Sequence, residues 1–184
     1  MSYKIRPART SDVPVIRKLI DANVDSGRLL SKPTVTLYED IQEFRVAELA
    51  EAELPELTGL TGGEVLAGCG AVHVLWDDLA EIRTVAVHQL CRGRGIGHGI
   101  VDHLIECCRE LGVRRVFVLT FAIDFFASRG FKPINGTPVS AEVYRELLRS
   151  YDEGVAEFLD LERVKPNTLG NTRMLLHLLQ DQMK

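Results

Sequence analysis

The residues best suited to chemistry are the glycines and arginines of the stretch CRGRGIGHG, residues 91–99. Alternate glycines let a ligand approach the main chain closely, because no Cβ stands in the way. A helix that begins here adds unpaired amide groups and the positive end of its dipole. These features predict an anion site for a phosphate or pyrophosphate. The expected binding residues, called the anion turn below, are Arg92, Gly93, Arg94, Gly95, Ile96, Gly97 and His98.

Two common phosphate-binding patterns do not fit the anion turn. The pattern GxxxxGK[ST] of nucleoside-triphosphate-binding loops is absent from the chain. The dinucleotide pattern GxGxxG also fails, because its third glycine would fall on His98 or on Ile100. The spacing therefore predicts a phosphate group without identifying the ligand that carries it.

The anion turn lies inside a predicted strand–helix–strand unit. Glu81–Val87 (EIRTVAV) is rich in residues that favour strands. The helix after the turn has one apolar face and should stop at Gly112. Arg115–Phe121 (RVFVLTF) is typical of a buried strand. The two strands should be parallel neighbours, because a helical crossover joins them.

The remaining segments should complete an α+β fold with a mixed sheet and helices on both faces. Ser11 and Ser140 are expected to cap helices. Ala50–Gly63 is expected to be a surface connection. We predict a single domain over residues 1–184. Further strands are expected at Tyr3–Arg6, Phe44–Leu49 and Val65–Trp76, after Phe131 and near 174–179, and further helices near Leu37 and over Ile123–Ser128.

The anion turn resembles a motif of a known enzyme family. Residues 92–97 (RGRGIG) match the pattern [RQ]-x-x-G-x-[GA] of the GNAT acetyltransferases, which bind the pyrophosphate of acetyl-coenzyme A at this turn. The stretches IRPARTSD, EIRTVAV and FFASRGF resemble other parts of that fold, so the likeness covers nearly the whole chain. It implies a mostly antiparallel sheet with a central parallel βαβ pair. It also implies acetyl-CoA as co-substrate, and we expect no metal.

A narrower resemblance concerns the acceptor. The stretches GCGAVHVL, AEIRTVAV, FVLTFAIDFFASRGF and GNTRMLL are similar to N-acetylglutamate synthases, most of all to short stand-alone forms without an amino-acid-kinase-like domain. This resemblance implies acetyl transfer from acetyl-CoA to the α-amine of L-glutamate, or also of L-glutamine, by direct attack in a ternary complex. That reaction is the entry step of arginine biosynthesis.

By resemblance, Glu81 stands where the family places a catalytic glutamate, so it is the expected general base. A base is needed because the acceptor arrives as an α-ammonium that must lose a proton before it can attack. Strand alternation places Glu81, Arg83, Val85 and Val87 on one face. The resemblance implies that the amide of Val85 meets the acetyl carbonyl and that Val85, Ala86 and Val87 bind the cosubstrate. The alternative is that Glu81 is a structural carboxylate paired with Arg83 or another cation.

Phe126 stands where many family members carry a tyrosine that protonates the leaving thiolate. A phenyl ring cannot donate a proton, so Phe126 is expected to contact the cosubstrate and to pack in the core. Either a nearby hydroxyl such as Thr120 protonates the thiolate, or the thiolate leaves without help. The alternative for Thr120 is a hydrogen bond to backbone.

The carboxylates of the acceptor require cations or other donors. By resemblance, His73 stands where longer relatives have a substrate-contacting lysine, and Thr172 where they have a serine at the substrate carboxylate. Gly170 stands where they have an arginine, so another cation must compensate. The alternative for each cation is a solvated surface role. The expected acceptor-binding residues are Lys32, His73, Arg83, Thr172 and Arg173.

Composition excludes several other classes of protein. With 22 Lys and Arg against 26 Asp and Glu, the net charge of −4 argues against nucleic-acid binding. No apolar run approaches the length of a membrane helix, and the start of the chain lacks a signal region, so we expect a cytoplasmic protein without membrane contact. Four cysteines without a CxxC pair favour reduced thiols. A homodimer formed through C-terminal elements is also expected from relatives.

Two other functions stay open at this point. A protein or peptide N-acetyltransferase would use the same cosubstrate and would need an open groove for its peptide. A non-catalytic acyl-CoA-binding sensor would keep the anion turn and lose the chemistry, and the phenylalanine at position 126 favours it.

Overall fold

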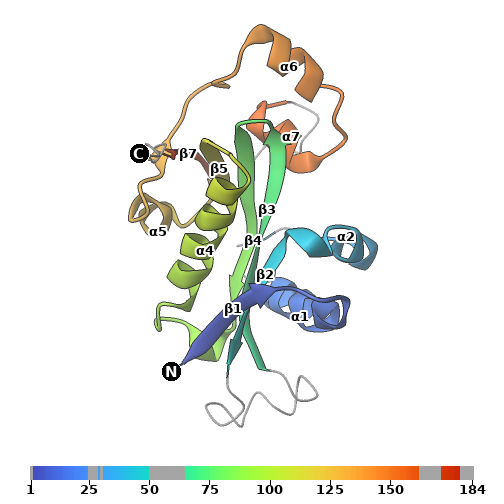
Figure 1. The fold of residues 1–184 in the computed structure, drawn as a ribbon, viewed down its shortest axis with the longest axis vertical. Coiled ribbons are helices and arrows are strands. Elements are labelled where there is room, and N and C mark those ends of the chain that lie inside the picture. The colour runs from blue at the N-terminus through green and yellow to red at the C-terminus, as the bar shows by residue number, and fades with distance from the viewer. Residues whose placement is uncertain (1, 25–28, 30, 50–64, 162–170, 179–184) are drawn as a thin grey trace. The chain divides into compact units, whose positions relative to one another are not determined.

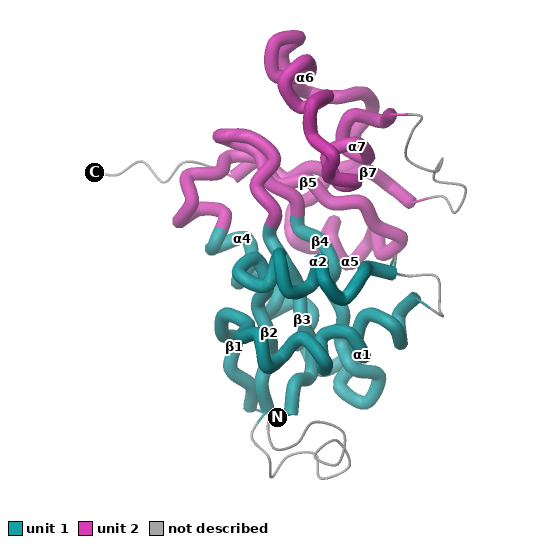
Figure 2. Tube along the Cα trace, turned by 90° about the vertical axis from the view of Figure 1, so that its right-hand side faces the viewer, with its two compact units in different colours: residues 1–72, 82–107 teal, residues 73–81, 108–184 magenta. Residues whose placement is uncertain are grey.

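The computed structural model describes the chain except residues 1, 25–28, 30, 50–64, 162–170 and 179–184, so the predicted connection Ala50–Gly63 lies outside the described residues. Two compact units are present, one of residues 1–72 and 82–107 and one of residues 73–81 and 108–184 (Figure 2). Strands β3 (Val65–Trp76) and β4 (Leu79–Val87) contribute residues to both.

Seven strands are hydrogen-bonded in the order β1-β2-β3-β4-β5-β7-β6. The pairs β1–β2, β2–β3, β5–β7 and β6–β7 are antiparallel. The parallel pair is β4–β5, with Leu79 opposite Arg115 and Glu81 opposite Phe117. The predicted α+β fold with a mostly antiparallel sheet and one parallel βαβ pair is confirmed.

The first unit places helices on both faces of its strands (Figure 1). It contains β1 (Tyr3–Pro7), β2 (Phe44–Leu49) and the helices α1 (Val13–Val24) and α2 (Thr34–Glu39). Short 3-10 helices are η1 (Thr10–Asp12), η2 (Ile41–Glu43) and η4 (Gln89–Cys91). The long helix α4 (Ile96–Glu110) follows the anion turn.

Two glycines of β3 allow α4 to pack closely against the sheet. A Cβ at Gly68 would lie 2.9 Å from Cδ1 of Ile100, and a Cβ at Gly70 would lie 2.8 Å from Cδ1 of Leu104. Both distances are too short for real carbon atoms, so only glycine fits without movement of these side chains. The opposite face of the same strands buries an apolar core under α1 and α2, which includes Ile16, Leu37, Val46, Cys69 and Ala86.

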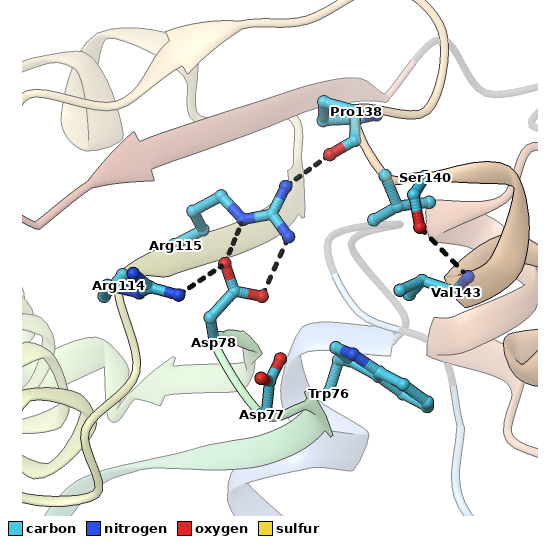
Figure 3. Close-up of a pocket in the computed structure, with 9 residues that line it drawn as sticks. Trp76, Asp77, Asp78, Arg114, Arg115, Pro138, Ser140 and Val143 are labelled. Carbon is cyan, nitrogen blue, oxygen red and sulfur yellow. Dashed lines mark hydrogen bonds and ion pairs between the residues drawn. The ribbon is translucent and has the colours of Figure 1, made fainter.

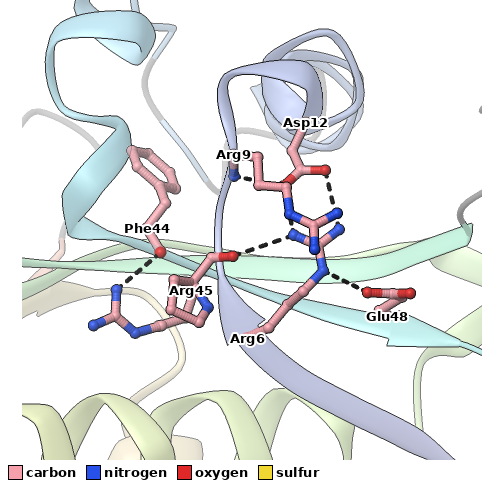
Figure 4. Close-up of polar contacts among 7 residues, drawn as sticks. Arg6, Arg9, Asp12, Phe44, Arg45 and Glu48 are labelled. Carbon is pink, nitrogen blue, oxygen red and sulfur yellow. Dashed lines mark hydrogen bonds and ion pairs between the residues drawn. The ribbon is translucent and has the colours of Figure 1, made fainter.

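The predicted Ser11 cap is wrong, because the N-cap of η1, directly before α1, is Arg9 and the capping carboxylate is that of Asp12. Ser11 lies inside η1, and the Asp12 carboxylate accepts a hydrogen bond from the Arg9 amide at 2.7 Å. Arg6 donates to both oxygens of Asp12 at 2.7 and 3.1 Å and also pairs with Glu48 (Figure 4). Burial alone would raise the pKa of Asp12, but these bonds to Arg6 and Arg9 outweigh it and lower the pKa.

The second unit packs short elements on β5 (Arg115–Thr120) and β7 (Thr172–His177), which pair from Arg115 opposite His177 to Thr120 opposite Thr172. Strand β7 begins two residues before the expected 174. Phe117 and Phe158 meet edge to face in the core, with ring centroids 5.2 Å apart. The other elements are α5 (Ile123–Ala127), β6 (Lys132–Pro133), α6 (Ala141–Leu147) and α7 (Glu153–Phe158).

Helix starts in the second unit follow local capping rules. The Ser140 hydroxyl accepts from the Val143 amide at 3.2 Å, which confirms the predicted cap of α6. The Asp152 carboxylate accepts from the Val155 amide at 3.1 Å and caps α7, a helix that the sequence analysis did not predict.

Candidate functional site

The anion turn has the backbone conformation that a phosphate cradle requires. Gly93 and Gly95 adopt φ of 73° and 79°, values that residues with a Cβ rarely adopt. A Cβ at either position would meet nothing within 4 Å, so this part of the turn is open. Ile96 is buried and begins α4, whose first amides have no acceptor within the helix. These amides and the helix dipole favour an anion at the turn.

A buried amide holds Arg92, the first residue of the anion turn. The Arg92 Nη2 atom donates to Oδ1 of Asn23 at 3.0 Å. Asn23 is 6% exposed, and its Nδ2 atom donates to the Leu19 carbonyl at 2.7 Å, so the end of the amide that does not bind Arg92 is fixed within α1. The guanidinium is therefore tethered beside the open glycines.

His88, as a neutral imidazole, caps the 3-10 helix η4 that directly precedes the anion turn. Its Nδ1 atom accepts a hydrogen bond from the Leu90 amide at 3.3 Å and so caps η4. Burial lowers the pKa of His88, and the positive charge of Arg92 lowers it further. Both effects favour the neutral ring, which alone can accept this bond.

Strand β4 reverses its faces at Thr84, so the expectation that Arg83, Val85 and Val87 share one face is wrong. Thr84 adopts φ of 58°, a left-handed conformation that is unusual for a β-branched residue. Such a residue interrupts strand alternation in the same way as a β-bulge. Val85 and Val87 approach Gly70 and Gly68 on the face of α4, each with its Cγ2 atom at 3.4 Å from the added Cβ position.

Arg83 lies on the other face of β4, where it forms ion pairs. Its Nη2 atom is 3.0 Å from Oε2 of Glu43 and 3.3 Å from Oδ2 of Asp40. The Arg83 side chain is only 10% exposed. Its charge is thus balanced by two acidic side chains between α2 and β2.

Glu81 is buried in the second unit beside the start of α7. It is 4% exposed and pairs with Phe117 in the parallel register of β4 and β5. A Cβ at Gly154 would overlap Oε2 of Glu81 and lie 2.9 Å from its Cδ. The same point lies 3.0 Å from Oδ1 of Asp152, so this oxygen and Cδ of Glu81 are at most about 6 Å apart. His73 completes the group, with Nε2 3.5 Å from Oδ2 of Asp152.

Thr120 and Thr172 are direct neighbours across β5 and β7. The Thr120 hydroxyl accepts from the Ala122 amide at 2.9 Å and is 8% exposed. Accepting this bond leaves its proton available for donation elsewhere. Phe126 packs as expected of a core residue, 5.0 Å from Phe125 and 5.4 Å from Phe131 by ring centroids.

Arg173 and Lys32, the remaining predicted acceptor cations, lie in different units. Arg173 donates to the Phe158 carbonyl, and its Nη1 atom is 3.8 Å from Oδ2 of Asp160. Lys32 is half-buried in the first unit, and its carbonyl accepts from Arg17. The second unit therefore holds His73, Thr172 and Arg173, whereas the first holds Lys32 and Arg83.

Asp152 and Gly154 are the residues of this region that sequence reasoning missed. Asp152 precedes Val155 by three residues, the spacing of a helix N-cap, and this local signal could have revealed α7. Nothing local connects Gly154 with Glu81, because the two approach each other only in the folded unit.

A separate cavity of about 440 Å³ in the second unit contains none of the predicted site residues. Arg115 donates from Nε and Nη2 to the two oxygens of Asp78 at 2.9 and 2.8 Å, and also donates to the Pro138 carbonyl (Figure 3). These bonds lower the pKa of Asp78. The cavity is lined by Trp76, Asp77, Asp78, Arg114, Arg115, Pro138, Val139, Ser140 and Val143.

The described residues contain neither a metal centre nor a helix that could span a membrane. No group of three or more His, Cys, Asp or Glu side chains there could hold a metal ion. All four cysteines are described, buried and free of disulfides. Burial raises the pKa of Cys69 to about 12, so this thiol stays protonated. None of the described helices combines the length and apolar character needed to cross a bilayer.

Sequence comparisons agree with this arrangement. The profile described as "Acetyltransferase (GNAT) family" matches residues 28–131. An amino-acid acetyltransferase of Mycobacterium tuberculosis is 58% identical over 175 residues, which cover 95% of this chain and 94% of that one. An uncharacterized N-acetyltransferase of Chlorobaculum tepidum is 30% identical over 142 residues, or 77% of this chain and 83% of that one.

Solved structures show the same fold. Rv2747 from Mycobacterium tuberculosis, in complex with CoA and NLQ, superimposes with a TM-score of 0.84 at 58% identity and covers 96% of this chain and 99% of that one. An N-acetylglutamate synthase from Neisseria gonorrhoeae, complexed with coenzyme A and N-acetyl-glutamate, has a TM-score of 0.73 at 23% identity. It covers 98% of this chain and 36% of that one, and this likeness concerns the fold alone. The glycine-built anion turn, the parallel β4–β5 pair and these matches together place the chain in the GNAT acetyltransferase family.

Proposed function

We propose that this chain transfers the acetyl group of acetyl-CoA to the α-amine of L-glutamate, with L-glutamine as a second acceptor. The observation that carries the proposal is the pair of left-handed glycines, Gly93 and Gly95, directly before α4. They leave main-chain amides uncovered for a diphosphate. The relative at 58% identity, which is named an amino-acid acetyltransferase, supports the acceptor class. In this proposal the reaction opens arginine biosynthesis.

The cosubstrate binds along the anion turn and the second half of β4. The first amides of α4 take the diphosphate, and Arg92 and Arg94 balance its charge. The segment Val85–Val87 runs beside the pantetheine arm. Val85 and Val87 are half-buried, so they offer apolar surface and main-chain groups to that arm.

The reaction needs one base and two hydrogen-bond donors. Glu81 accepts a proton from the α-ammonium of the acceptor, and the resulting amine attacks the thioester carbonyl. The Val85 amide, on the same strand, donates to the oxyanion that forms. The C–S bond then breaks, and the electron pair leaves with the sulfur. The Thr120 hydroxyl donates a hydrogen bond to this thiolate. The second proton of the amine nitrogen passes to the thiolate, so CoA leaves as the thiol and the product is the neutral amide.

The acceptor carboxylates are bound by donors of the second unit. Arg173 supplies the guanidinium, Thr172 a hydroxyl and His73 a ring nitrogen. Arg83 is left out of this clamp, because Asp40 and Glu43 already balance its charge.

Acetyl-CoA turnover tests the acceptor class, measured as thiol release with L-glutamate, L-glutamine and a panel of peptides. We expect turnover with the amino acids and none above background with the peptides. Activity on peptides alone would reject the proposal and establish a peptide acetyltransferase. CoA binding without turnover of any amine would establish a non-catalytic acyl-CoA-binding sensor.

Substitution Glu81→Gln tests the base. We expect kcat to fall by about 100-fold or more, because general-base catalysis contributes about 10²- to 10⁴-fold. CoA affinity should stay unchanged. Glu153→Gln, at an exposed position of α7, is the matched control and should keep wild-type turnover.

A further inference from the structure

The main chain of α7 contacts the carboxylate of Glu81 at Gly154. A Cβ at this position would overlap Oε2 and lie 2.9 Å from Cδ of Glu81. Gly154 is buried and helical, and its φ lies outside the left-handed region. Backbone conformation therefore does not require glycine here, and alanine is the better helix former. The requirement comes from the space that the Glu81 carboxylate occupies.

Asp152 fixes the position of this part of α7. Its Oδ1 atom accepts from the Val155 amide at 3.1 Å, and its Oδ2 atom lies 3.5 Å from Nε2 of His73. His73 belongs to β3, so the cap residue is held both by its helix and by a strand. The side chains of Asp152 and His73 are 25% and 23% exposed, whereas Glu81 is 4% exposed. Glu81 is thus more deeply buried than these two polar side chains.

We propose that the start of α7 positions Glu81 for catalysis, with Gly154 setting where the carboxylate lies and Asp152 anchoring the helix. The proposal rests on the function proposed above, in which Glu81 is the base. Gly154 and Asp152 act through Glu81 and are positioning residues. A base must reach the proton of a bound acceptor, so the position of its carboxylate affects kcat more than cosubstrate binding.

Substitution Gly154→Ala tests the positioning role. The new methyl group collides with the end of a side chain rather than with backbone, so the fold should persist while the carboxylate moves. We expect kcat to fall by about 10- to 100-fold, since misplacement by about 1 Å can cost 100-fold. The KM for acetyl-CoA and the Kd for CoA should stay within twofold of wild type. Glu153→Ala in the same turn is the matched control and should leave kcat unchanged.

A double-mutant cycle tests the contact without reference to activity. In the Glu81→Ala background, Gly154→Ala no longer meets the Glu81 carboxylate, and the nearest remaining atom is Oδ1 of Asp152 at 3.0 Å. The substitution should then raise Tm, because alanine favours the helix. In the wild-type background, the same substitution should leave Tm unchanged or lower it. A rise in Tm that occurs only in the Glu81→Ala background supports the contact between Gly154 and Glu81.

Two results would overturn the proposal. One is a change in Tm on Gly154→Ala that is equal in both backgrounds, which would contradict the contact between Gly154 and the Glu81 carboxylate. The other is a Gly154→Ala variant whose kcat stays within twofold of wild type, which would remove the positioning role. The Tm cycle remains informative if the wild-type chain turns over no amine, so failure of the proposed function is distinguishable from failure of the contact.

Discussion

The guanidinium of Arg92 is hydrogen-bonded to the side-chain amide of Asn23, with 3.0 Å between Nη2 and Oδ1. The bond links the anion turn to the last turn of α1, which is distant in sequence. Asn23 is itself fixed by its bond to the Leu19 carbonyl. A charge that would otherwise move on a long side chain is therefore held by a buried group.

Removal of this tether should weaken cosubstrate binding. We expect Asn23→Ala to raise the Kd for CoA by about 2- to 12-fold, since a hydrogen bond contributes a net of about 0.5–1.5 kcal/mol. Isothermal titration calorimetry measures the change, and circular dichroism checks the fold. Asn135→Ala, at an exposed position, is the control. An unchanged Kd in a folded variant would show that the tether has no part in binding.

A β-branched residue at Gly95 should disrupt the anion turn. Its φ of 79° is costly for such a residue, and its side chain would enter the space of the ligand. We expect Gly95→Val to weaken CoA binding by at least about tenfold, since the left-handed conformation alone costs about 1–2 kcal/mol. Calorimetry measures the change.

Gly136→Val is the control for backbone strain in that experiment. Gly136 has φ of 72° and, like Gly95, no atom within 4 Å of an added Cβ. It lies outside the anion turn, so its substitution should lower stability and leave CoA affinity unchanged. Equal losses of affinity in both variants would contradict the placement of the diphosphate.

The cap of α7 gives a prediction on stability. Asp152→Ala removes the acceptor of the Val155 amide and should lower the free energy of unfolding by about 1 kcal/mol. Asp152→Asn keeps an equivalent cap and should cost much less. Urea denaturation measures both. If asparagine costs as much as alanine, then the interaction with His73, rather than the cap, is the main contribution.

Asp78 gives a prediction on acid stability. The hydrogen bonds from Arg115 lower its pKa in the folded state, while an unfolded aspartate has a pKa of about 3.9. The unfolded chain therefore binds the proton first, and the stabilisation is complete above about pH 4–5. It is lost as the pH falls through the lower, folded pKa.

Thermal melts of wild type and Asp78→Asn between pH 2.5 and 6 measure this effect. The difference in Tm should be largest near pH 6 and shrink below about pH 4. A difference that is constant with pH would contradict the role of the Asp78 charge.

The anion turn was predictable because its signals are local. The glycines, the arginines and the apolar face of the helix all lie within one short stretch, and the structure has Gly93 and Gly95 left-handed with α4 beginning at Ile96. The Gly112 stop was predictable for the same reason, and its φ is 80°.

The candidate base region was predictable only in part. Alternation along a regular strand predicted one face for Arg83 and Val85, but nothing in the sequence marks Thr84 as left-handed, because threonine usually favours extended backbone. The contact of Gly154 with Glu81 is tertiary and leaves no local pattern. Ser11 and Asp12 are both good cap residues, and nothing local shows that Asp12 bonds to Arg6, which comes from β1.

The reversal at Thr84 makes β4 a strand of two independent halves. Before Thr84, Arg83 forms ion pairs with acidic side chains. After Thr84, Val85 and Val87 pack beside the glycines of β3. Neither requirement restricts the other. Chimaeras that exchange segments between relatives should therefore be joined at this residue, where two separately packed halves meet along a single backbone.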